Sequence, residues 1–169
     1  MSARVRRLAL ALALLPGLIV DPGRRALLAQ MRAFCRALPQ ALEAPLSGAL
    51  DRMLAVEAQA APYSPDTLRR LADLAALLER RSPLGLCLRR SLTRAHFLRR
   101  AGVPVAVQFG AKFVDGRPDR AVTGHAWLTL DGRPYFEDEE NWREFTVMLA
   151  YPPLRPDIDR DRARGREPR

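Results

Sequence analysis

The sequence predicts an α+β fold, with helices in the first half followed by a small antiparallel sheet. Apolar residues recur at helical spacing up to about residue 80. After residue 103 the chain changes to short β-rich segments, and one pair of them is separated by Asp131-Gly132, a typical hairpin turn. Between the two halves, Cys87 stands at the start of a helical segment. We therefore expect one catalytic domain over residues 1–154, with a helical part at 1–81 and a catalytic helix plus sheet at 82–154.

The helices of the first half are predicted from their start signals and apolar stripes. Asp21-Pro22 and Ser64-Pro65 each combine an N-cap side chain with a proline at the first helical position. The predicted helices cover residues 8–15, 22–38, 42–58 and 65–80. We expect these helices to supply packing rather than chemistry.

The second half is predicted to hold one more helix and the strands. The helix opened by Cys87 runs to Arg100 and ends at Ala101-Gly102. Strands are expected over residues 103–109, 125–130, 133–137 and 145–149. The mixed-charge run 155–169 is expected to be a disordered tail without function.

Composition argues against several classes of partner and location. The net charge of +9 is almost entirely arginine spread along the chain, and no zinc-ligand spacing or aromatic RNA-binding strand accompanies it, so we expect no nucleic-acid partner. Two cysteines form no disulfide framework, which favours a reducing compartment. Three arginines followed by the apolar run 8–15 imitate a signal peptide. The run lacks a small-x-small cleavage site and is too short to span a bilayer, so we expect a cytoplasmic protein without a membrane partner.

Cys87 and His125 are the candidate nucleophile and base. A thiol at a helix N-terminus is activated by the partial positive charge there, and the helix amides can receive an oxyanion. His125 opens a strand and is followed by Trp127, whose indole can hold the imidazole. His96 lies nine residues after Cys87 on the same helix, about 13 Å along its axis, which is too far for proton transfer. Cys35 lies within an apolar stripe and is expected to be a buried small hydrophobe.

A base histidine also needs an acceptor that fixes its tautomer, and two carboxylates remain open for this role. Asp131 is explained by the turn. If the hairpin loop has two residues, the pairing count places Asp138 opposite His125, whereas a three-residue loop places Glu137 on the histidine's face. Pattern alone does not fix the register.

A cysteine at a helix start followed by a histidine on a later strand is the layout of papain-like and transglutaminase-like thiol enzymes. The residues also resemble one family more closely, the B2 proteins of lasso-peptide biosynthesis, a branch of the transglutaminase-like cysteine proteases. The resemblance is carried by three runs between Leu86 and Glu137: Cys87-Leu88-Arg89-Arg90-Ser91-Leu92, Gly124-His125-Ala126-Trp127 and Asp131-Gly132-Arg133-Pro134.

The resemblance implies a cysteine peptidase that removes the leader from a ribosomally made precursor peptide. It implies a triad of Cys87, His125 and an acid that falls at Glu137 by the family's spacing, with no metal or cofactor. Residues 1–80 show no winged-helix-like recognition element, so a separate B1-type recognition protein is expected, together with an asparagine-synthetase-like cyclase. Two other functions fit the residues: an acyl- or amide-transferring enzyme of the same fold, and a non-catalytic helical adaptor.

Overall fold

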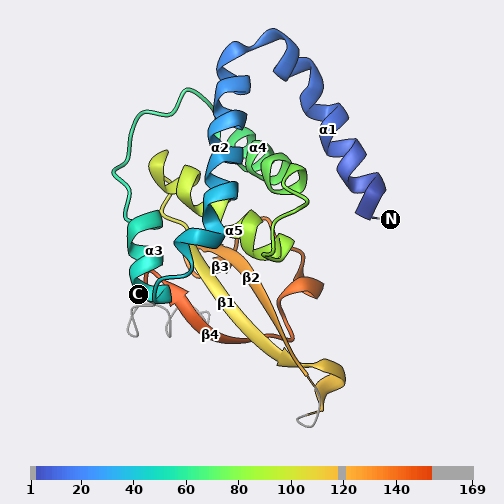
Figure 1. Ribbon diagram of the computed structural model, residues 1–169, viewed down its shortest axis with the longest axis vertical. Helices are drawn as coiled ribbons and strands as arrows, with labels where there is room; N and C mark the ends of the chain where they lie inside the picture. The colour runs from blue at the N-terminus through green and yellow to red at the C-terminus, as the bar shows by residue number, and fades with distance from the viewer. Residues whose placement is uncertain (1–2, 118–120, 154–169) are drawn as a thin grey trace, which may run out of the picture. The chain divides into compact units, whose positions relative to one another are not determined.

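The protein is described here by a computed structural model, which covers the backbone of residues 3–117 and 121–153 (Figure 1). Within these residues five α-helices precede a four-stranded antiparallel sheet, so the predicted α+β class is confirmed. The chain forms two compact units, a helical unit (Met1–Val103) and a sheet unit (Pro104–Arg169). The tail expected at 155–169 lies outside the described residues, and the assignment of residues 1–154 to one catalytic domain stays a prediction.

Two helices begin where their start signals predict. In α2 (Pro22–Ala41) the Asp21 carboxylate accepts a hydrogen bond from the Arg24 amide at 3.2 Å. In α4 (Pro65–Leu78) the Ser64 hydroxyl accepts one from the Thr67 amide at 3.3 Å. Both helices carry proline in the first turn, where the missing N–H costs nothing because no intrahelical acceptor exists for it.

Two other helices differ in length from the predicted ones. The first, α1 (Ala3–Val20), is longer and continues through Pro16. The third, α3 (Leu46–Leu54), begins later than the predicted 42–58, because Pro45 disfavours helical geometry at the residue before it, and it also ends earlier. Among the described residues, no helix combines the length and the apolar character needed to cross a membrane.

The core of the helical unit is formed where α4 contacts α2 and α5 (Leu86–Arg100), and where α3 contacts α5. Its fully buried apolar side chains include Met31, Leu38, Leu50, Leu54, Leu71, Leu92 and Leu98. A buried ion pair also joins α4 to α5, since Nη2 of Arg94 lies 2.6 Å from Oδ2 of Asp73. Removing either partner would leave a buried charge, which typically costs about 3–5 kcal/mol. The pair therefore helps to fix α5, the helix that carries Cys87.

The sheet has the strand order β3-β2-β1-β4. Its strands are β1 (Ala106–Phe113), β2 (Val122–Leu130), β3 (Arg133–Pro134) and β4 (Thr146–Tyr151). Asp131 and Gly132 form a two-residue loop with φ of 51° and 75°, and Leu130 faces Arg133 across it. The predicted hairpin is thus confirmed, although its second strand is only two residues long instead of the predicted five.

Candidate active site

Cys87 is half-buried at the second position of α5, two residues after the N-cap residue Gly85. The first amides of an α-helix have no acceptor within the helix, and Gly85 has no side chain to cap them. The Cys87 sulfur lies 3.8 Å from where a Cβ on Gly85 would stand, so it points back toward the helix start. This places the thiol where the helix dipole favours its anionic form.

The other cysteine is placed quite differently. Cys35 on α2 is fully buried, and its sulfur lies 2.9 Å from the hydroxyl of Thr93 on α5. Burial raises the pKa of the Cys35 thiol. Since the thiolate is the reactive form, Cys35 is a packing residue, as the sequence predicts, and neither cysteine is in a disulfide.

His125 lies on β2 between two aromatic rings. Its imidazole stacks on Trp127 with centroids 5.8 Å apart and lies against Phe145 at 5.3 Å. Nε2 of His125 is 3.5 Å from Oε1 of Glu137, within ion-pair distance. The side chains are 15% exposed for His125 and 2% for Glu137. The imidazole is thus enclosed on several sides, with a buried carboxylate beside one nitrogen.

The structure brings Glu137, and not Asp138 or Asp131, to the imidazole. Asp131 sits in the hairpin turn, and Asp138 is exposed at the start of a short 3-10 helix (Glu139–Asn141). A two-residue hairpin loop would place Asp138 opposite His125 if the strand pairing continued. The pairing stops, because Phe136 takes a left-handed conformation with φ of 51° and breaks the alternation of side chains.

A model of the transglutaminase-like superfamily matches residues 34–150 of this chain. The chain belongs to the transglutaminase-like superfamily. That superfamily includes cysteine proteases and acyltransferases, and its members are generally enzymes. No curated protein and no solved structure matches the chain. The matched segment contains all three candidate residues, Cys87, His125 and Glu137.

Pattern analysis of this transglutaminase-like chain missed two residues around the base. Gly110 on β1 faces His125, and a Cβ there would lie 2.8 Å from the Trp127 ring and 2.9 Å from Cβ of Phe145. Phe145 was read only as the start of a strand, although its ring contacts the imidazole. An isolated glycine inside a strand often marks such a close approach, so Gly110 could have indicated from sequence that other side chains pack against β1 there.

The cationic side chain of Lys112 lies near Phe145, one of the rings that contact His125. The Lys112 amine lies 4.8 Å from the centre of the Phe145 ring and 2.7 Å from Oε2 of Glu144. This ion pair lowers the pKa of the Glu144 carboxyl. The pair also lines a groove of about 860 Å³ within the sheet unit, together with Phe113, Val122 and Met148.

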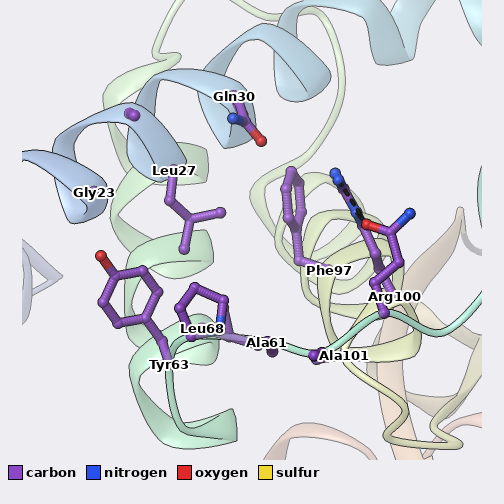
Figure 2. Close-up of a pocket in the computed structure, with 13 residues that line it drawn as sticks. Gly23, Leu27, Gln30, Ala61, Tyr63, Leu68, Phe97, Arg100 and Ala101 are labelled. Atoms are coloured by element: carbon purple, nitrogen blue, oxygen red, sulfur yellow. Dashed lines mark hydrogen bonds between the residues drawn. The ribbon is translucent and has the colours of Figure 1, made fainter.

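A second cavity, of about 260 Å³, lies within the helical unit (Figure 2). Leu27, Leu68 and Phe97 form its apolar walls, and a polar edge is made by Arg100, whose guanidinium donates to the Gln59 side chain at 3.0 and 3.1 Å. The lining described for either cavity includes none of the three candidate residues. Among the described residues there is also no cluster of three metal-ligating side chains.

Proposed function

We propose that this protein is a cysteine endopeptidase that removes the leader from a lasso precursor peptide through a thioester intermediate. The observation that carries the proposal is the 3.5 Å approach of the buried Glu137 carboxylate to Nε2 of His125, in a superfamily chain whose Cys87 opens a helix. A carboxylate that orients a histidine, in a chain that also places a cysteine at a helix start, supplies the groups that a thiol enzyme needs.

The carboxylate sets the roles of the two imidazole nitrogens. With its proton on Nε2, the nitrogen that faces the Glu137 carboxylate, the imidazole keeps Nδ1 as the basic nitrogen. In the proposed reaction Nδ1 takes the proton from Cys87, and the sulfur attacks the carbonyl carbon at the leader–core junction. Amides at the start of α5 then receive the oxyanion.

The rest of the cycle uses the same groups. When the tetrahedral intermediate collapses, the C–N bond breaks and Nδ1–H of His125 gives its proton to the leaving amine of the core peptide. The leader stays on Cys87 as a thioester. A water molecule then loses a proton to Nδ1 and attacks the thioester, which releases the leader acid and restores the thiol. The proposed steps use only Cys87, His125, the peptide and one water molecule.

The substrate class rests on the three sequence runs between Leu86 and Glu137 that resemble the B2 family. We propose accordingly that the protein acts in the cytoplasm with a separate B1-type recognition protein, and that an asparagine-synthetase-like cyclase uses the released core amine. A short peptide gene and a gene for such a cyclase beside this one would be the most direct genetic support.

The test is cleavage, by the full chain together with the recognition protein, of the precursor peptide encoded by a gene beside this one. Cys87→Ala and His125→Ala are each expected to lower the cleavage rate by roughly 10³-fold or more while the precursor still binds, because both residues act in bond making and breaking. Cys35→Ser is the matched control and should cleave normally. Unchanged cleavage by either of the first two variants would refute the mechanism.

Two further measurements separate this proposal from its alternatives. Mass spectrometry after brief iodoacetamide treatment should show label on Cys87 rather than Cys35, and the Cys87 reaction below neutral pH should slow in His125→Ala, because the thiolate then loses its imidazolium partner. Equal labelling of both cysteines, or none, would favour an adaptor. Product formed with an added amine in place of water would favour an acyl-transferring enzyme.

A further inference from the structure

The outer face of α1 carries an apolar stripe that the rest of the helical unit leaves uncovered. Leu12, Leu15 and Ile19 are 58%, 49% and 66% exposed. They are spaced by three and four residues, so they lie along one side of the helix. Leu14, which points away from that side, is buried, and α1 contacts α4 and α2 (Figure 1). The helix is thus anchored through one face and presents leucine and isoleucine on the other.

The same part of the chain holds most of the net positive charge, because it contains few acidic residues. Residues 1–41 contain seven arginines and a single acidic residue, Asp21, which gives this segment a net charge of +6 out of +9 for the whole chain. Arg4, Arg6 and Arg7 precede the stripe in the sequence. At its other end the exposed Arg25 donates to the carbonyls of Leu18 and Ile19 at 3.0 and 2.9 Å. Arginines therefore stand before and after the apolar stripe.

We propose that α1 binds the surface of a membrane that contains anionic lipid, lying in the plane of the interface. The apolar stripe enters the acyl boundary, and the arginines on either side of it meet lipid phosphates. A nucleic acid would attract the arginines but leave the apolar stripe in water, whereas an anionic bilayer can attract the arginines and also bury the stripe. This proposal replaces the expectation from sequence of a protein without a membrane partner, and it is independent of the proposed peptidase activity.

The test is sedimentation of the full chain with vesicles. Vesicles of equal parts phosphatidylcholine and phosphatidylglycerol should carry the protein down, and vesicles of phosphatidylcholine alone should carry much less. Added salt should release the protein, because it screens the arginine–phosphate attraction. The combined variant Leu12→Ser, Leu15→Ser and Ile19→Ser should weaken binding by roughly tenfold or more, because burying each of these side chains contributes to affinity.

A matched control is available on β4, where Val147 and Met148 are 41% and 70% exposed. Val147→Ser with Met148→Ser removes a comparable exposed apolar surface and should leave vesicle binding unchanged. The melting temperature of the α1 variant should stay close to wild type, since the substituted side chains are on the surface. Three results would overturn the proposal: no binding to the anionic vesicles, undiminished binding by the α1 variant, or a dimer in solution that depends on the stripe and replaces vesicle binding.

Discussion

At the residue scale, the environment of Glu137 distinguishes it from its neighbour. Its side chain is almost fully buried beside Nε2 of His125, while Asp138 is exposed. A buried carboxylate is costly unless a cation or hydrogen-bond donors compensate it, so an imidazole that gains a proton during the reaction suits this position. The two adjacent acids thus stand in different environments, and substitutions can test them separately.

We expect Glu137→Gln to lower the cleavage rate by roughly 10²- to 10⁴-fold, because glutamine keeps the volume but no longer holds the imidazole in the required tautomer or stabilises its cationic form. Asp138→Asn is the matched control and should cleave at nearly the wild-type rate. Steady-state cleavage across a range of pH is the measurement, with circular dichroism to verify folding. A larger loss in Asp138→Asn would assign the third role to the other acid.

At the scale of elements, a glycine on β1 leaves room for the aromatic rings that contact His125 on β2. His125 and Gly110 face each other in the register, and the missing side chain at 110 leaves room for the rings of Trp127 and Phe145. Phe145 immediately precedes β4, so the edge strand contributes to the enclosure of an imidazole two strands away. The imidazole of His125 is thus positioned by residues of β1 and β2 together with Phe145.

Gly110→Ala should lower the free energy of unfolding by about 1–3 kcal/mol, because the new methyl group overlaps the Trp127 ring and Cβ of Phe145. The cleavage rate should fall as well, since the imidazole loses its support. Gly124→Ala is the control on the facing strand, where the nearest atom to an added Cβ is 3.8 Å away. Urea denaturation of both variants checks the prediction, and equal stabilities would contradict it.

At the scale of the whole molecule, net charge is unevenly distributed. The first 41 residues hold +6 of the net charge, which leaves +3 for the other 128. Basic residues occur along the whole chain, but the net positive charge is concentrated in this one segment, where few acids balance it.

In the helical unit α3 is joined to α5 by His96, whose Nδ1 donates to the Met53 carbonyl at 2.6 Å while the ring stacks on Phe34.

Stability should depend on pH through His96. Burial lowers the pKa of His96 below its ordinary value, so the folded state favours the neutral ring. The unfolded chain then binds a proton more readily, and the contribution of this residue is complete above about pH 6.5 and is lost as the pH falls through the lowered pKa. His96→Asn, which keeps a donor for Met53 but does not titrate there, should reduce the loss of unfolding free energy between about pH 7 and pH 5. An identical pH dependence in the variant would contradict this assignment.

Local sequence signals determined the start of several elements. Asp21-Pro22 and Ser64-Pro65 specify helix starts, and Asp131-Gly132 specifies a two-residue hairpin. Cys87 is likewise predicted at a helix start, because Pro83 and Gly85 interrupt helical structure just before it. Each of these features depends on residues within about four positions of one another, which is why pattern analysis finds them.

Contacts between distant residues were decided only by the tertiary structure. Arg89 on α5 is buried, with its guanidinium donating to the carbonyl of Glu79, ten residues earlier in the chain. The approach of Glu137 to His125 depends on the left-handed backbone at Phe136, which no pattern indicates for a bulky residue. The exposed stripe of α1 became visible once the buried face of that helix was known. Sequence periodicity shows that a residue is apolar or charged, but only the packed chain determines what it contacts.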